Sequence, residues 1–390
     1  MAASLASRGN AWNSYIFDIT FTQIPTIGYT IFAMKFKTPG LITCIAGVIV
    51  LSGSANAQQE DPWSIYGDAR VRAEFNDTEG GSDRHRMRMR LRAGAKYQAS
   101  DSLLFNFRLV TGDSDEPNSV HQDAGDAFNS FNVSLDRLHF DWSMSEHVNV
   151  LFGKFGNPIF RNPVYGELVW DGDVAPEGVA FVSEYDDFNF SFGQYAVAEN
   201  TNEQSEDAWA SVASIDTNIG DFTVGGSYTF YGNMSGKGIA IDLNGDKTDN
   251  RTNSVVGDSF VSDFGIVDIN LAYNIGALTA SFEAIENIRA DDSVEASGMA
   301  LGLAYKMENG DKFYVTSNSI DQDAVFTAFS GDDTLGQASN YEGQILGYKT
   351  TLDNGLGMHV WGMAIAPLDT EIAGFDNTEY RFRIDFNLSF

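Results

Sequence analysis

Apolar and polar residues alternate one by one along much of this chain. In the run that ends the sequence, the apolar positions are Tyr380, Phe382, Ile384, Phe386, Leu388 and Phe390, and the polar positions between them are Arg381, Arg383, Asp385, Asn387 and Ser389. A period of two places successive side chains on opposite faces of a β-strand. The pattern therefore predicts a strand with one apolar face and one polar face.

Similar runs recur about sixteen times along the chain, most of them about 9–13 residues long. They cover residues 63–75, 84–97, 103–111, 131–143, 147–155, 178–183, 188–199, 208–218, 222–231, 263–274, 277–288, 298–307, 312–319, 341–352, 356–366 and 378–390. These lengths are near what a tilted strand needs to cross a lipid bilayer. Aromatic residues gather toward the ends of several runs, as expected where rings meet the headgroup region.

The connections between the runs alternate between short and long. The short ones are 98–101, 184–187, 218–221, 274–277, 307–311 and 352–355, and the long, polar ones are 113–130, 156–177, 232–262, 320–340 and 367–377. Short periplasmic turns and long extracellular loops are typical of an outer-membrane barrel. A soluble β-sandwich also alternates apolar and polar residues, but it does not need so many strands. We expect an all-β, transmembrane antiparallel β-barrel of about 16 strands.

The N-terminal region contains a complete secretory signal between residues 34 and 57. Lys35 and Lys37 form a basic start, an apolar segment follows, and 55–57 reads Ala-Asn-Ala, a cleavage motif. Residues 1–33 precede this signal, and we expect them to be a wrongly included extension ahead of a true start at Met34. We thus expect a signal peptide over 34–57 and a barrel over 58–390. A genuine but unusual leader is the alternative.

Composition excludes several classes of function. The chain has one cysteine, Cys44, which falls in the leader, so disulfides and thiol chemistry are not expected in the mature protein. Three of the 24 basic residues and one of the 54 acidic residues lie before residue 58, which leaves 21 basic and 53 acidic residues and a net charge of −32. Such an acidic chain is not expected to bind nucleic acid.

A row of arginines is the strongest local feature. Every second residue in one run is an arginine: Arg84, Arg86, Arg88, Arg90 and Arg92. The row therefore lies on one face of one strand. An arginine on the lipid face costs about 2–4 kcal/mol at the bilayer midplane, so this face must point into the barrel. Arg70, Arg72 and Arg108 have the parity to join it.

Like charges about 7 Å apart repel, so the row needs anionic partners. One interpretation is a structural ladder neutralised by inward acids such as Asp68, Glu74 and Glu167. The other is a positive wall inside the lumen, made mainly by the row and Arg108. The two overlap, and we favour a combination of both.

The segment after the fifth run resembles a known family. Residues 153–160 read GKFGNPIF and residues 168–181 read LVWDGDVAPEGVAF. Both stretches are similar to the "Putative porin" family of Gram-negative bacteria. The resemblance covers about 30 residues in motif, and most of the mature chain only in layout.

The resemblance implies a porin in the cell outer membrane. Such a barrel is a water-filled channel for passive diffusion of small hydrophilic solutes and ions, in contact with outer-membrane lipid and lipopolysaccharide. Porins of this size usually form homotrimers. A terminal strand ending in Phe390 resembles the signal read by the β-barrel assembly machinery.

In sixteen-stranded porins, the third long loop commonly folds into the barrel and narrows it. By strand count that loop is about 156–177 here, and it carries Glu167, Asp171, Asp173 and Glu177. Acids on this loop that face the arginine row would create a transverse field, which selects polar and dipolar solutes. The alternative is that these acids only fix the loop to the wall. The sign of ion selectivity is left open.

Other signals for chemistry are weak. Residues 242–250 contain several acids but depart from the calcium-loop pattern, so a solvated loop is the better interpretation. The five histidines show no metal-binding spacing. The mature chain has no G-x-S-x-G, phosphate-binding or dinucleotide motif, so we expect no catalytic residue, metal or cofactor.

Two other classes of function remain as alternatives. An outer-membrane lipid hydrolase would need a Ser or Thr nucleophile beside a His, and hydrolysis of lipid by the purified protein would reveal it. A structural or adhesive barrel would give no conductance.

Overall fold

The computed structural model describes most of the chain after residue 61 and a short part before it. The described residues are 17–24, 29–36, 62–78, 83–112, 119–125, 130–199, 206–235, 252–257, 259–331, 339–373 and 378–390.

The chain divides into two compact units, Met1–Glu60 and Asp61–Phe390. The first contains an antiparallel pair of strands, β1 (Phe17–Ile24) and β2 (Tyr29–Phe36). The expected start at Met34 falls within β2. The apolar segment of the expected signal peptide, its cleavage motif and residue 58 lie outside the described residues.

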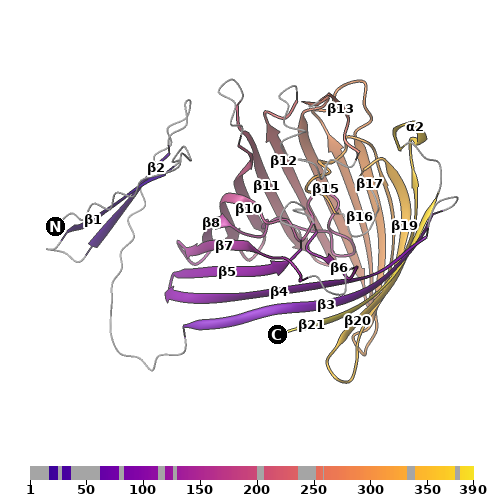
Figure 1. Ribbon diagram of the computed structural model, residues 1–390, viewed down its shortest axis with the longest axis horizontal. Helices are drawn as coiled ribbons and strands as arrows, with labels where there is room; N and C mark the ends of the chain where they lie inside the picture. Colours follow the sequence, from indigo (N-terminus) through magenta and orange to yellow (C-terminus); the bar gives the residue numbers. More distant parts are fainter. Residues whose placement is uncertain are drawn as a thin grey trace. The chain divides into compact units, whose positions relative to one another are not determined.

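The second unit is a closed antiparallel barrel of sixteen long strands (Figure 1). The strands are β3 (Trp63–Thr78), β4 (Arg84–Ser100), β5 (Leu103–Thr111), β7 (Val133–Ser143), β8 (Val148–Lys154), β9 (Glu177–Glu184), β10 (Asn189–Ala198), β11 (Ala208–Ile219), β12 (Phe222–Gly232), β15 (Phe264–Ile275), β16 (Leu278–Asn287), β17 (Ser297–Lys306), β18 (Lys312–Ile320), β19 (Tyr341–Thr351), β20 (Gly357–Pro367) and β21 (Glu379–Ser389). The expected fold class is confirmed, and each expected run coincides with one of these strands. A two-residue strand, β6 (Gln122–Asp123), pairs with β4 near Arg88.

Strand β21 pairs with β3 and closes the barrel. Their register places Arg383 opposite Glu74 and Asp385 opposite Arg72. Beyond the ladder, Phe390 and Gly67 exchange two backbone hydrogen bonds, with N–O distances of 2.9 and 3.0 Å. The polar side chains of both strands therefore meet inside the barrel along this seam.

The two faces of the wall differ as the alternation predicts. On β17 the outward residues Leu301, Leu303 and Tyr305 are about half exposed, whereas the inward Ala300 and Ala304 are buried. An outward belt of large apolar side chains is stable only against lipid, because each large side chain left in water forgoes about 1.5–3 kcal/mol. Among the described residues, no helix is long and apolar enough to cross a membrane. The described helix, α2 (Thr370–Ala373), has four residues.

The chain between β8 and β9 folds into the barrel. Its Trp170 is 1% exposed and stacks on Tyr231 of β12 and on Phe329, with ring centroids 6.1 and 5.2 Å apart. The indole Nε1 donates a hydrogen bond to Thr229 Oγ1 at 3.1 Å. Backbone hydrogen bonds join this loop to the segment after β18, from Asp171 N to Phe329 O at 2.7 Å and from Gly331 N to the Glu167 carbonyl oxygen at 2.8 Å.

The chain between β8 and β9 also contacts the inner face of β12 and β18. Phe160 lies directly over Gly225 of β12, where a Cβ atom would collide with its ring. Farther along, Lys312 Nζ of β18 donates to the Pro163 carbonyl oxygen at 3.4 Å. Apolar side chains of the loops and of the inner wall thus fill the lumen beside strands from β10 to β20, in a cluster that includes Phe155, Trp170, Tyr231, Phe260, Phe264 and Phe326. The strands β21, β3, β4 and β5 line the remaining interior with charged residues.

Candidate functional site

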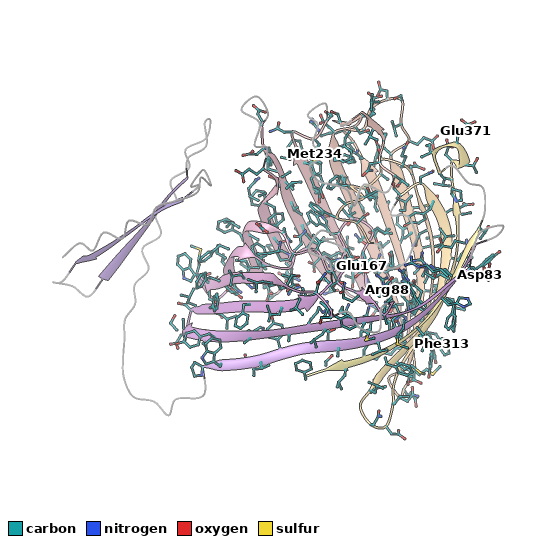
Figure 2. The ribbon with its side chains drawn as sticks, in the orientation of Figure 1. Asp83, Arg88, Glu167, Met234, Phe313 and Glu371 are labelled. Atoms are coloured by element: carbon teal, nitrogen blue, oxygen red, sulfur yellow. The ribbon has the colours of Figure 1, made fainter. Side chains whose placement is uncertain are left out.

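The arginine row lies on the inner face of β4. Arg88 and Arg90 are each 7% exposed, whereas Met87 and Leu91, on the other face, are nearly half exposed. Arg88 lies within the outline of the barrel in Figure 2. The parity argument therefore placed these side chains correctly: the row faces the lumen.

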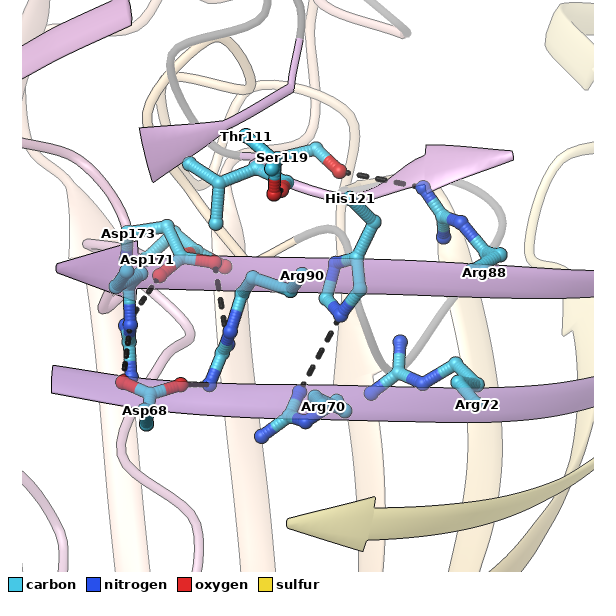
Figure 3. A network of polar contacts seen from close by, with 12 residues as sticks. Asp68, Arg70, Arg72, Arg88, Arg90, Thr111, Ser119, His121, Asp171 and Asp173 are labelled. Carbon is cyan, nitrogen blue, oxygen red and sulfur yellow. Dashed lines mark hydrogen bonds and ion pairs between the residues drawn. The ribbon is translucent and has the colours of Figure 1, made fainter. Parts of the chain in front are cut away.

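The half of the row nearest the infolded loop makes two acidic contacts. Asp68 of β3 bridges Arg90 and Arg92, with N–O distances of 2.7 and 2.6 Å. Asp173, from the loop, also reaches both arginines, at 3.7 and 2.8 Å (Figure 3). An acid of the infolded loop thus meets the row by direct contact, which ties the loop to the wall as the second interpretation of the sequence expects.

The other half of the row gathers around Asp123 of β6. This carboxylate contacts the side chains of Arg84, Arg86 and Arg88 at 3.0–3.1 Å. Arg88 Nη2 also donates to Ser119 Oγ at 3.3 Å (Figure 3). Asp123 comes from a long loop, where alternation along the strands carries no signal for this contact.

Neighbouring strands extend the charged wall. Arg72 pairs with Asp385 at 2.7 Å, and both side chains are 1% exposed. Glu74 contacts both Arg86 and Arg383. Removing one partner of such a buried pair costs about 3–5 kcal/mol. Arg381 and Arg383 occupy inward positions of β21. Their alternation in the sequence could have added them to the candidate residues.

Arg108 of β5 joins the wall through an irregularity in the sheet. The register between β5 and β7 shifts between Arg108 and Leu109, where Asp136 is the extra residue of β7. This bulge lets Asp136 contact the guanidinium of Arg108. Sequence parity alone does not reveal a bulge, so this partner was missed.

The four expected loop acids have different surroundings. Asp171 is buried, and its Oδ1 accepts a hydrogen bond from the Asp173 backbone N at 2.6 Å. Glu167 interacts electrostatically with Lys349 of β19. Thus Asp173 contacts the row directly, Asp171 shapes the turn that presents it, and Glu167 faces another wall.

Glu177 departs from the expectation. It begins β9 and forms an ion pair with Lys154 of β8 at 2.9 Å. Residues 177 and 181 lie on the same face of β9. That face points outward, since Phe181 on it is exposed and Ala180 on the other face is fully buried. The strand begins earlier than the sequence suggested, so Glu177 belongs to the wall and not to the constriction.

The charges in this region do not balance one to one. Among the described residues, the five arginines of the row form ion pairs with four carboxylates, those of Asp68, Glu74, Asp123 and Asp173, and Glu74 is shared with Arg383. In this set of ten side chains the positive charge is in excess. Such an arrangement can hold water and polar solutes in an ordered field.

The structure adds little about metals. Within the described ranges, no group of three or more His, Cys, Asp or Glu side chains is placed to hold a metal ion. The acidic stretch 242–250 lies outside the described residues. Of the histidines, His121 contacts Arg70 Nη1 at 3.5 Å and His359 contacts Tyr314 Oη at 3.0 Å.

A family model described as "Putative porin" matches residues 54–234. No curated protein sequence matches the chain. Among solved structures, Salmonella typhi OmpF in complex with daunomycin has a TM-score of 0.55 and 10% identity, with 84% of this chain and 97% of that chain covered. A loop-deletion mutant of OmpT, an outer membrane protein of Vibrio cholerae, has a TM-score of 0.53 and 12% identity, with 84% and 100% covered.

A mutant of the Rhodopseudomonas blastica porin has a TM-score of 0.51 and 13% identity, with 84% of this chain and 100% of that chain covered. At these identities, the likeness is one of fold. Together, the family match and the closed sixteen-stranded barrel confirm the expected resemblance to the "Putative porin" family, and the chain is an outer-membrane β-barrel with the fold of a porin.

Proposed function

We propose that the chain forms a water-filled channel for passive diffusion of small hydrophilic solutes and ions across the outer membrane. The observation that carries the proposal is the arginine wall, which faces Asp173 of the infolded loop. Arginine, aspartate and glutamate side chains are costly in an apolar core, but they are well placed beside water. Sixteen strands also enclose a lumen too wide for wall side chains alone to fill.

In this proposal, the path runs beside the charged strands β21, β3, β4 and β5. The opposite side of the lumen is filled by loop residues around Trp170. A permeating solute therefore passes along a wall of arginines in which Asp173 of the loop is ion-paired with Arg90 and Arg92. A dipolar solute can align with this field, whereas a large apolar solute would have to displace ordered water.

The proposal assigns the residues transport roles and no catalytic role. Arg84, Arg86, Arg88, Arg90, Arg92 and Arg108 supply positive charge, and Asp173 and Asp171 oppose it at the loop. We further propose that Phe390 is read during assembly and that the barrels associate as a homotrimer.

The test is swelling of liposomes that contain the purified, folded protein. Sugars of increasing size should enter at rates that fall steeply with solute size, because a fixed constriction sieves by diameter. Empty liposomes are the control. Swelling no faster than in the control, or hydrolysis of the liposome lipid, would contradict the proposal.

A further inference from the structure

Three buried polar side chains on the wall opposite the arginines have atoms that are not satisfied. They are Glu283 of β16 and Thr316 and Asn318 of β18, which are 3%, 1% and 2% exposed. One carboxylate oxygen of Glu283, the Thr316 hydroxyl and both amide atoms of Asn318 have no hydrogen-bond partner among the described residues. Each such atom left without a partner costs about 1–3 kcal/mol, so a group of them calls for water or a bound ligand as partner.

The sheet register brings these side chains to one place. Glu283 pairs with Ala300 of β17, and Ala300 pairs with Asn318 on the other side. One step along, Gly302 lies between Ser281 and Thr316 in the same way. Because the inward residues of β17 are small, the side chains of β16 and β18 face one another over β17, with backbones about 10 Å apart.

The infolded loop covers this space, which we call the polar box. A Cβ atom on Gly302 would lie 2.7 Å from Val164 Cγ1 of the loop and 2.5 Å from Ser281 Oγ. The loop is held over the wall by Asn162, whose Nδ2 donates to Asn270 Oδ1 at 3.0 Å. The polar box thus has a floor of β17, walls from β16 and β18, and a roof from the loop.

The polar box also lies beside a second carboxyl group. Asp268 of β15 is 5% exposed and interacts electrostatically with Glu283. Within the described part of the chain, neither carboxylate forms an ion pair with a Lys or Arg. Arg161 of the loop acts on Glu283 from a distance, but its guanidinium donates to the carbonyl oxygens of Gly166, Trp170 and Asp171.

We propose that the polar box binds Ca²⁺. Glu283, Asn318 and Thr316 would supply carboxylate, amide and hydroxyl oxygens, and Asp268 would place a second carboxyl group beside the ion. Oxygen donors of mixed type suit Ca²⁺, which accepts irregular geometry, better than Mg²⁺, which requires a near-ideal octahedron. This site contains two carboxyl groups. It is therefore distinct from the groups of three or more His, Cys, Asp or Glu side chains that are absent from the described ranges.

A cation here would join two strands of the wall directly beneath the loop. It would satisfy the Glu283, Thr316 and Asn318 oxygens and so hold Val164 in place over them. The inference does not depend on conduction, because the polar box belongs to the wall and the loop.

The test is equilibrium dialysis of the folded protein in detergent against ⁴⁵Ca²⁺, after removal of metal with a chelator. Dialysis to constant counts allows for slow entry of the ion. The parent is compared with Glu283→Gln and with the matched control Glu286→Gln, an exposed carboxylate on the same strand. Because the many surface acids bind Ca²⁺ weakly, only saturable binding is scored.

The parent and Glu286→Gln should each bind one Ca²⁺ per chain, and Glu283→Gln should weaken that binding at least tenfold. Should Glu283→Gln fail to fold, Asn318→Leu, which removes a neutral ligand of similar size, should also weaken it at least tenfold. Absence of saturable binding in the parent would overturn the inference. Equal binding by the parent and by both polar-box variants would overturn it as well.

Discussion

Replacing Asp173 by Asn removes one negative charge from the face of the loop that meets the arginine row. In the structure this carboxylate contacts Arg92 at 2.8 Å and Arg90 at 3.7 Å. The amide of Asn is nearly the same size, so the loop should keep its position while the two arginines lose a counter-charge. We predict that permeation shifts toward anions.

The size of the shift follows from Coulomb's law. A unit charge about 7 Å from a passing ion contributes about 0.6 kcal/mol in water, close to RT, and salt near 0.1 M roughly halves it. The change acts on cations and anions in opposite directions, so the anion-to-cation permeability ratio should rise about threefold. With a tenfold salt gradient, this moves the reversal potential by about 20 mV.

The assay is the reversal potential of single channels in planar bilayers at 0.1 and 0.01 M salt. Glu177→Gln is the matched control, because it removes the same charge from an outward residue paired with Lys154, and it should leave the potential within a few millivolts of the parent. Equal reversal potentials for Asp173→Asn, Glu177→Gln and the parent, with conductance retained, would refute the reasoning.

Four further predictions concern selectivity, the loop, assembly and the start of the mature chain. Replacing Arg88 and Arg90 by Ser removes two positive charges and should shift the reversal potential toward cations by more than the single loop variant shifts it toward anions; no shift would mean that the row is purely structural. Trp170→Ala should destabilise the protein by about 3–5 kcal/mol in urea unfolding and increase conductance noise, because a fully buried ring and its hydrogen bond are lost; unchanged stability would show that the loop does not depend on this ring. Phe390→Asp should reduce the amount of folded protein in the outer membrane, and normal levels would argue against an assembly role. N-terminal sequencing of mature protein should begin at Gln58, and any residue upstream of Met34 would contradict the expected leader.

The strands could be predicted from the sequence because each one buries a single face. A period of two is fixed by the strand itself, so the inward direction of Arg88 and Arg90 followed from the alternation and from the cost of charge in lipid. The expected run 103–111 matches β5 without change. Strand ends were less certain, since residues near the headgroup region tolerate both apolar and polar neighbours.

The partners of the arginines were harder to predict because they depend on contacts between distant segments. Asp123 comes from a loop, and Asp136 reaches Arg108 only through a bulge. The role of Trp170 likewise depends on Tyr231 and Phe329, which lie far along the chain. Local patterns carry no information about which loop segments meet inside a barrel.

The most direct test of the central claim is single-channel recording of the parent protein in a planar bilayer. Protein shown to be folded by its heat-modifiable mobility on gels should produce discrete conductance steps that rise with salt concentration and are absent from protein-free bilayers. Folded protein that inserts into the bilayer without any conductance step would contradict the account, since the lumen beside the arginine wall would then be blocked to ions.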